Sequence, residues 1–306
     1  MRTAYLETLY DLAATDKNVF ALISDNGAIV YDKYRRDFPN QFINAGISES
    51  NMVGLAAGMA KMKKIPFAYT IASFLIYRAY EFVLNDVCLQ NQNVKLVGIG
   101  SGYSYSLLGP SHHSIFDLSV LRPLPNLIIF SPASPLEVKK VVKAAYELNS
   151  PVYIRLGTNR EPEIYEHDYE FVPGRGVELQ GGNDITLIGT GRIVGELLTV
   201  ANQLEINGIS ARVINIHTVK PLDKEIIINA ATETRAMLSV EEHSIFGGLG
   251  GAIAEVLAEH CLSVPFMRMG LTDFAVGYGS YDDMKKMNGL NEEAVIANAQ
   301  RLLNGL

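Results

Sequence analysis

Short apolar runs rich in β-branched residues alternate with stretches of helical periodicity along most of the chain. In the first half, strands are predicted at 19–23, 66–70, 94–99, 127–130 and 152–155. Helices are predicted between them, at 5–14, 50–63, 74–90, 114–121 and 135–148. This alternation is typical of an α/β fold in which helices cover both faces of a parallel sheet.

The pattern breaks after residue 158, where the chain becomes polar and carries several prolines and glycines. We expect a linker at 161–182, between a first domain at 1–160 and a second domain at 183–306. The second domain repeats the alternation, with strands predicted at 185–189, 211–216, 236–240 and 264–267 and helices at 193–207, 223–231, 250–261 and 292–303. The sequence thus predicts two doubly wound α/β domains with mainly parallel sheets.

Composition narrows the classes of function. The 306 residues are 48% hydrophobic and 19% charged, as in globular proteins with full cores. The net charge of -7 argues against nucleic acid or an anionic membrane surface as the main partner. No apolar run reaches the length of a membrane span, and the first residues do not read as a signal peptide, so we expect a cytoplasmic protein. Cys88 and Cys261 lie far apart in apolar helical patterns and are predicted to be buried free thiols.

The most informative segment is 44–52, which contains Glu49 and leads into a predicted helix rich in small residues. A carboxylate at the mouth of a helix is favoured by the backbone N–H groups and by the helix dipole. Acids in the first helical turn are also common without any chemical role, so the motif alone leaves both interpretations open. The small, apolar residues around Glu49 favour a chemical role.

Other chemically capable side chains also follow predicted strands. The segment 69–80 carries Phe74, Tyr77 and Arg78, and the loop 109–117 carries a pair of histidines. Ligands of open parallel sheets bind beyond the carboxyl ends of the strands, so we expect these segments to form one site together with Glu49. Paired histidines also suggest a metal site, but only Asp117 stands near them as a further ligand, so no metal is predicted in this chain.

These segments resemble the pyrimidine-binding domain of transketolase-type enzymes that depend on thiamine diphosphate. The stretch 240–251, with a Glu-Glu-His run followed by several glycines, is similar to the C-terminal domain of the same family. The resemblance implies that Glu49 activates the aminopyrimidine ring of the cofactor and that Phe74 stacks on this ring. It places Tyr77 and Asp25 near the cofactor, although a core aromatic cluster and a turn aspartate are the alternatives for Phe74 and Asp25.

The resemblance also assigns residues to the substrate. His112 matches a histidine that contacts substrate oxygens, with His113 beside it in the same Gly-Pro-Ser-His-His loop. Arg155 matches an arginine that binds substrate phosphate, and Arg2 resembles a second one. A structural salt bridge is the alternative for Arg155.

Three further points qualify this assignment. Arg78 points toward an anionic substrate or, alternatively, toward Glu81 or Asp86 on its own predicted helix. Leu108 stands where transketolases commonly have an acid, and a histidine replaces their glutamine at 113. The resemblance therefore supports the chemistry better than the usual sugar phosphate substrates.

The chain resembles only two of the three domains of a full transketolase. The remaining domain of the family binds the diphosphate and a divalent ion such as Mg²⁺ through a Gly-Asp-Gly motif, which this sequence lacks. The resemblance therefore implies a separate N-terminal transketolase subunit that carries Gly-Asp-Gly, in an α2β2 assembly.

The leading hypothesis is the C-terminal subunit of a split transketolase-like enzyme that moves a two-carbon ketol unit between sugar phosphates or sugar-like acceptors. The enzymatic alternatives are the β subunit of a 2-oxoacid dehydrogenase E1 and a deoxyxylulose phosphate synthase-like enzyme. A non-catalytic regulatory subunit is the alternative from another class of protein.

Overall fold

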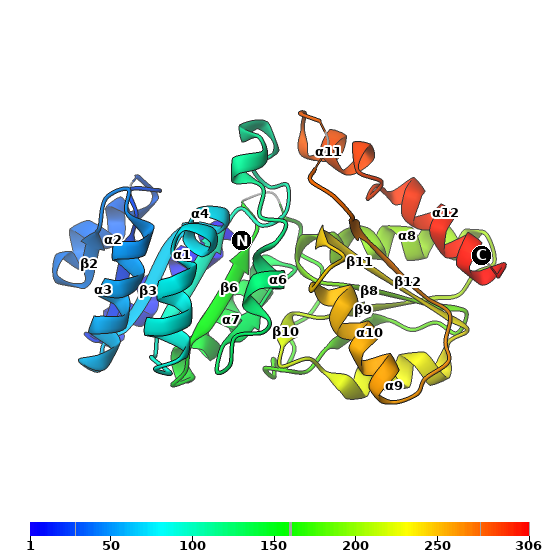
Figure 1. The fold of residues 1–306 in the computed structure, drawn as a ribbon, viewed down its shortest axis with the longest axis horizontal. Helices are drawn as coiled ribbons and strands as arrows, with labels where there is room; N and C mark the ends of the chain where they lie inside the picture. Colours follow the sequence, from blue (N-terminus) through cyan, green and yellow to red (C-terminus); the bar gives the residue numbers. More distant parts are fainter. Residues whose placement is uncertain (28, 159–160, 276, 306) are drawn as a thin grey trace.

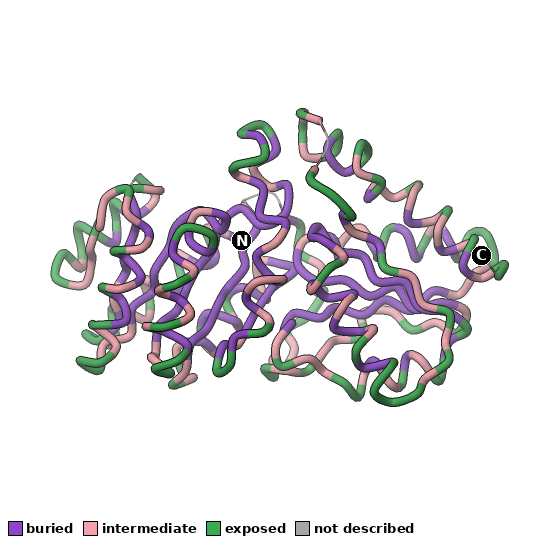
Figure 2. Tube along the Cα trace, in the orientation of Figure 1, coloured by how far each residue is buried: buried purple, intermediate pink, exposed green. Residues whose placement is uncertain are grey.

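The computed structural model describes residues 1–27, 29–158, 161–275 and 277–305. Two sheets lie side by side, one built mainly by the first half of the chain and one by the second, each between helices (Figure 1). Burial is concentrated in the strands and on the inward sides of the helices (Figure 2). The predicted class, two doubly wound α/β units with mainly parallel sheets, is confirmed.

The strands of the first sheet are Val19–Ile23 (β1), Phe42–Asn44 (β2), Ile65–Ile71 (β3), Lys95–Ile99 (β4), Ile128–Phe130 (β5), Val152–Leu156 (β6) and Thr218–Lys220 (β10). Their order is β10-β5-β6-β4-β3-β1-β2, and only the β10–β5 pair is antiparallel among the described strands of this sheet. The carboxyl ends of β1, β2, β3, β4 and β6 therefore meet at one edge, as the predicted site requires.

Helices cover both faces of this sheet. The apolar sides of α1 (Arg2–Thr15) and α7 (Pro135–Glu147) share one core cluster with the strands, and those of α3 (Glu49–Lys61), α4 (Ala72–Arg78) and α6 (Asp117–Leu121) share another. The start of α7 follows from its sequence, because the Ser134 hydroxyl accepts a hydrogen bond from the Glu137 amide and Pro135 fits the first helical turn.

The second sheet has the order β12-β11-β8-β9-β7. Its strands are Val177–Gln180 (β7), Ile185–Gly189 (β8), Ala211–Asn215 (β9), Ala236–Ser244 (β11) and Phe266–Leu271 (β12). Its helices are α8 (Val194–Ile206) and α12 (Glu292–Leu303) in one core cluster and α9 (Lys224–Glu233) and α10 (Leu249–Glu259) in another. Asp223 caps α9 as the sequence predicts, since its carboxylate accepts from the Ile226 amide.

The two halves are joined more closely than a simple linker implies. The strand β7 falls within the predicted linker 161–182 and pairs with β9, while β10 leaves the second half to pair with β5. A buried carboxylate, Glu137 of α7, accepts hydrogen bonds from Tyr165 and Tyr169 of the connecting segment and from Asn215 of β9. This cluster ties the first half, the connection and the second sheet together.

Other predicted elements differ in detail. The predicted helix 74–90 is broken, because α4 ends at Arg78, a short helix α5 (Tyr80–Phe82) follows, and Val83–Cys88 forms a π-helix. Among the elements without a prediction are β2, β10, α2 (Asp32–Asp37) and α11 (Tyr281–Met287). Cys88 is buried as expected, but Cys261 is exposed, since it lies beyond the end of α10. Within the described residues, no helix combines the length and apolarity needed to cross a bilayer.

Candidate active site

Glu49 begins α3 at the carboxyl edge of the first sheet. The chain leaves β2 and turns through Gly46, whose φ of +72° lies in the left-handed region that glycine adopts without strain. The Ser24 hydroxyl, just after β1, donates to the Gly46 carbonyl (2.8 Å) and accepts from the Ser48 amide (3.1 Å). These bonds join the loops after β1 and β2 and fix the position at which Glu49 enters the helix.

Asp25 has a local partner in this corner. Its amide donates to Oδ1 of Asn44 (3.1 Å), and Nδ2 of Asn44 donates to the Asp25 carboxylate (3.1 Å). Asp25 has a φ of 53° and is exposed. It therefore orders the turn that carries Glu49, as the turn interpretation of this residue expects, and its contact with a cofactor stays a prediction.

Glu49 is buried and paired with one guanidinium. Its carboxyl group is 5% exposed, and its Oε1 and Oε2 lie 3.3 and 3.2 Å from Nη1 of Arg78. Arg78 ends α4, its side chain is 51% exposed, and its carbonyl accepts a hydrogen bond from the Ser50 hydroxyl. Arg78 thus pairs across to another helix rather than with Glu81 or Asp86 of its own segment.

The ring of Phe74 lies between this ion pair and the histidine loop. The guanidinium carbon of Arg78 lies 4.1 Å from the centre of the Phe74 ring, and the His112 ring meets Phe74 edge to face at 4.9 Å between centroids. Cations are attracted to aromatic faces, and edge-to-face ring pairs are favourable. The structure therefore brings Glu49, Phe74, Arg78 and His112 together, as predicted from the sequence.

His112 ends a short 3₁₀ helix in the loop after β4. Its Nδ1 lies 3.0 Å from the Ser111 hydroxyl, and the Ser111 carbonyl accepts from the Ser73 hydroxyl at the start of α4. Burial, with the positive charge of Arg78 adding to it, lowers the pKa of His112 below its ordinary value. The imidazole is therefore neutral at pH 7 and can accept or donate a hydrogen bond.

Tyr77 points toward the start of α6. Its hydroxyl accepts a hydrogen bond from the Phe116 amide (3.0 Å), and burial raises the pKa of this phenol well above its ordinary range. It stands one turn after Phe74, and 40% of it is exposed. Its contact with a cofactor stays a prediction.

His113 does not face the same space as His112. Its ring is buried against Tyr103 in an edge-to-face contact, and Nε2 lies 3.5 Å from the Ser106 carbonyl. Burial lowers its pKa. Because the ring faces the interior, the structure does not support the predicted contact of His113 with substrate.

Arg155 is enclosed between the two halves of the molecule. Its Nε lies 2.8 Å from Oδ2 of Asp117, and its Nη2 donates to the carbonyls of Ser114 (2.9 Å) and Glu242 (3.1 Å). With 3% of the residue exposed, a substrate phosphate has no access to this guanidinium. The predicted phosphate contact is therefore replaced by the structural salt bridge that the sequence left open.

Arg2 lies in the first turn of α1, and its amide donates to the Thr158 carbonyl (2.9 Å). Its side chain hydrogen-bonds to the Tyr69 phenol, and its positive charge lies close to Tyr105 as well. Thr158 and Tyr105 both line a cavity of about 550 Å³ between the loop at 104–108 and the start of α11. The role of Arg2 in binding phosphate stays a prediction.

The sequence did not single out the buried network around Asp117 and His243. Nε2 of His243 accepts from the Leu118 and Ser119 amides at the start of α6, and its Nδ1 donates to the Ser244 carbonyl (2.8 Å). Burial lowers the pKa of His243 to about 4, so the ring is neutral. Its role is structural, as expected, and the only sequence signal for the network was its run of polar residues inside a predicted strand.

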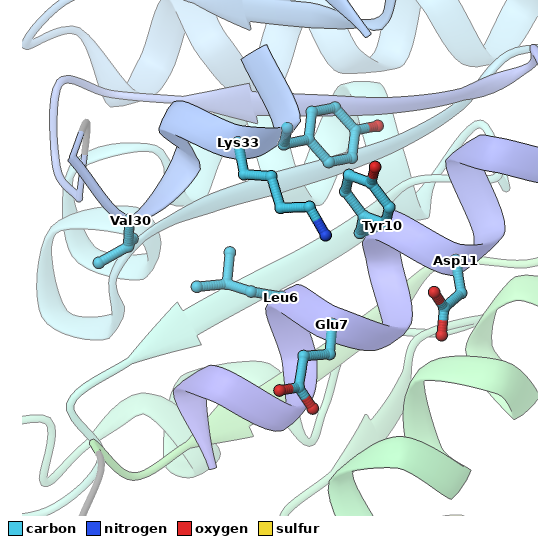
Figure 3. A pocket seen from close by; sticks show the side chains of 7 residues that line it. Leu6, Glu7, Tyr10, Asp11, Val30 and Lys33 are labelled. Atoms are coloured by element: carbon cyan, nitrogen blue, oxygen red, sulfur yellow. The ribbon is translucent and has the colours of Figure 1, made fainter. Parts of the chain in front are cut away.

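Another cavity, of about 340 Å³, lies between α1 and α2 (Figure 3). Lys33 reaches across it from α2, with Nζ 3.9 Å from the centre of the Tyr10 ring on α1. None of its lining residues belongs to the cluster around Glu49. Over the described residues, no three His, Cys, Asp or Glu side chains come together as metal ligands would.

Comparison with known proteins identifies the family. Residues 1–161 match the transketolase pyrimidine-binding domain, and residues 174–295 match the transketolase C-terminal domain. The chain belongs to the transketolase family.

Individual relatives agree with this assignment. One of the two subunits of apulose-4-phosphate transketolase from Actinobacillus succinogenes is 41% identical over 85% of this chain and 84% of its own length. A subunit of 6-deoxy-6-sulfo-D-fructose transketolase from a Clostridium species is 34% identical over 99% of this chain and 94% of its own. A solved structure described as a split-gene transketolase, inactive β4 tetramer, has a TM-score of 0.90 and 36% identity and covers 99% of this chain and 97% of that one.

Proposed function

We propose that the chain is the C-terminal subunit of a split, thiamine diphosphate-dependent transketolase-like enzyme. It transfers a two-carbon ketol unit between sugar phosphates or related anionic sugars. The observation that carries the proposal is the convergence of Glu49, Phe74 and His112 at one edge of the first sheet. A buried acid, an aromatic face and a neutral imidazole within one cluster form a donor set suited to this chemistry.

The residues present fit the aminopyrimidine part of the cofactor. The Glu49 carboxylate and the face of Phe74 already hold one planar, hydrogen-bonding group, the guanidinium of Arg78. An aminopyrimidine is also planar and also offers hydrogen-bonding nitrogens, so the same two side chains suit it. When bound, thiamine diphosphate supplies the electron sink for cleavage of a carbon–carbon bond.

This chain contributes proton transfer and substrate orientation. Glu49 exchanges a proton with a ring nitrogen of the aminopyrimidine, which its position at the start of α3 allows. His112, held by Ser111 and Phe74, donates a hydrogen bond to a substrate oxygen and stabilises negative charge that develops there. The fixed ring geometry keeps the donor oriented during the reaction.

We infer that a separate N-terminal transketolase subunit with the Gly-Asp-Gly motif completes the site in an α2β2 assembly. That subunit holds the diphosphate and a divalent ion such as Mg²⁺. Two observations support this inference: the sequence has no Gly-Asp-Gly, and the β4 assembly of a 36% identical relative is described as inactive.

We propose an anionic sugar as the substrate. The names of two relatives refer to a phosphorylated and to a sulfonated sugar, which share a tetrahedral anion at one end. Since Arg155 is enclosed, we assign the anion to the region of Arg2 next to the 550 Å³ cavity, where Arg192 adds a second positive charge. Guanidinium groups suit such oxyanions because they donate parallel hydrogen bonds.

Reconstitution tests the proposal. The chain is combined with a partner subunit that carries Gly-Asp-Gly, thiamine diphosphate, Mg²⁺, a ketose phosphate donor and an aldose acceptor. Ketol transfer that requires both subunits is expected. Release of CO2 from pyruvate, or reduction of a lipoyl group, contradicts the proposal in favour of the synthase or dehydrogenase alternative. Absence of any turnover with cofactor bound favours the regulatory alternative.

A further inference from the structure

Arg78 makes the same two contacts that the proposed function assigns to the cofactor ring. Its Nη1 lies within 3.3 Å of both carboxylate oxygens of Glu49, and its guanidinium carbon lies 4.1 Å from the centre of the Phe74 ring. A planar group that donates hydrogen bonds to Glu49 and covers the face of Phe74 describes the guanidinium and the aminopyrimidine equally well. The two groups exclude each other.

We propose that Arg78 is a placeholder: it occupies the aminopyrimidine position in the free subunit and is displaced when the cofactor binds. The inference rests on the proposed function, because it takes the aminopyrimidine as the incoming group. It adds a role for Arg78 that differs from contact with an anionic substrate.

The need for a placeholder follows from the burial of Glu49. A carboxylate that is 5% exposed loses most of its hydration, and an unpaired buried charge is costly. The guanidinium of Arg78 compensates this loss in the empty site. A bound aminopyrimidine takes over the hydrogen bond, so the pair with Arg78 is needed only before binding.

The surroundings of Arg78 permit the displacement. Its side chain is half exposed, in contrast to the enclosed Arg155, so it can move into solvent without losing hydration. Its backbone is held, because its carbonyl accepts from the Ser50 hydroxyl beside Glu49. The helix α4 also ends at this residue, and the chain continues into α5 and a π-helix. The movement therefore needs only side-chain torsions.

The placeholder has a thermodynamic consequence. A ligand that must displace an internal group binds with an apparent affinity reduced by the fraction of molecules in which the site is open. Removing the guanidinium should lower the stability of the free protein and tighten the binding of the cofactor. An arginine that holds the cofactor or has a purely structural role does not produce both effects.

The first arm of the test uses the isolated chain. Arg78→Met should lower the melting temperature by about 2–4 °C. In the Glu49→Gln background the same change should shift it by less than about 1 °C, because the partner charge is absent. Arg175→Met, at an exposed arginine, is the matched control and should cause almost no shift. Equal shifts of Arg78→Met in both backgrounds would overturn the pairing with Glu49.

The second arm uses titration calorimetry to measure how thiamine diphosphate binds to the reconstituted complex of both subunits. Arg78→Met should bind the cofactor about fivefold more tightly than wild type. Unchanged or weaker binding overturns the placeholder. Failure of the wild-type complex to bind thiamine diphosphate at all overturns the proposed function instead, so the two failures are distinguishable.

Discussion

Arg155 and Asp117 form a buried ion pair between the two halves of the molecule, with Nε and Oδ2 2.8 Å apart. Burial alone would raise the pKa of Asp117, but the charge of Arg155 holds it below its ordinary value. Tyr153 donates a further hydrogen bond to the same oxygen (2.7 Å). The pair therefore fixes the start of α6, whose following amides bind His243 of the second sheet.

Replacing Arg155 by Met should destabilise the chain by about 3–5 kcal/mol, because Asp117 would be left as a buried, unpaired charge. Denaturant unfolding measures this change. Arg175→Met, at an exposed site, should stay within about 0.5 kcal/mol of wild type. The double variant Arg155→Met with Asp117→Asn should lose less stability than the sum of the single changes.

The same residue separates a structural role from substrate binding. Arg155→Lys keeps a positive charge, and the reconstituted enzyme should keep its KM for phosphorylated substrates. A rise in KM for phosphorylated substrates only, with neutral ones unaffected, would contradict the enclosed position of Arg155 and restore the phosphate contact.

His112→Asn should lower kcat about 100-fold, as expected for loss of a hydrogen-bond donor at a developing oxyanion. Binding of thiamine diphosphate should be little changed, since Glu49 and Phe74 remain. His260→Asn, at an exposed histidine after α10, is the control and should be as active as wild type. A wild-type kcat in His112→Asn would remove His112 from the mechanism.

The lowered pKa of His112 also predicts the acid limb of the pH profile. The neutral imidazole is the functional form, so kcat/KM should stay constant as the pH falls through 6.5 and decline only below it. A decline that begins above pH 6.5 and disappears in the His112→Asn variant would contradict this prediction.

Much of the fold followed from the alternation of apolar runs with helical patterns. The strand Val19–Ile23 and the helix Glu292–Leu303 match their predicted ranges. The strands β2 and β10 were missed because three residues carry too little periodicity to be recognised. The break after Arg78 was missed because the change from α- to π-helical hydrogen bonding leaves the apolar pattern almost intact.

The candidate site followed from the sequence where local order decides position, and not where a distant partner decides it. Glu49, Phe74 and His112 each stand shortly after a strand, so the topology of the sheet brings them together. The pairing of Arg155 with Asp117 spans 38 positions, and that of Arg78 with Glu49 spans 29. Such pairs depend on the packing of helices and loops, which periodicity does not encode.

Lys95 tests the electrostatics of the core independently of catalysis. It is fully buried, its Nζ donates to the carbonyls of Leu148 (2.7 Å) and Ser150 (2.9 Å), and burial lowers its pKa to about 7. Between pH 7 and 10 the unfolded chain therefore binds more protons at this position than the folded one, and stability gains from raising the pH.

Compared with Lys95→Met, the wild type should therefore gain up to about 4 kcal/mol between pH 7 and pH 10. Urea unfolding of both proteins at several pH values measures the difference. A difference between the two proteins that does not vary with pH would show that the folded lysine keeps its ordinary pKa.

The role of Glu49 in activating the cofactor is tested most directly by the turnover of Glu49→Gln in the reconstituted enzyme. Its kcat should fall at least about 100-fold, since the amide cannot exchange the proton, while circular dichroism shows an intact fold. Glu81→Gln, at an exposed acid after α4, should turn over as wild type. Wild-type turnover by Glu49→Gln would contradict the assignment of Glu49 as the acid that serves thiamine diphosphate.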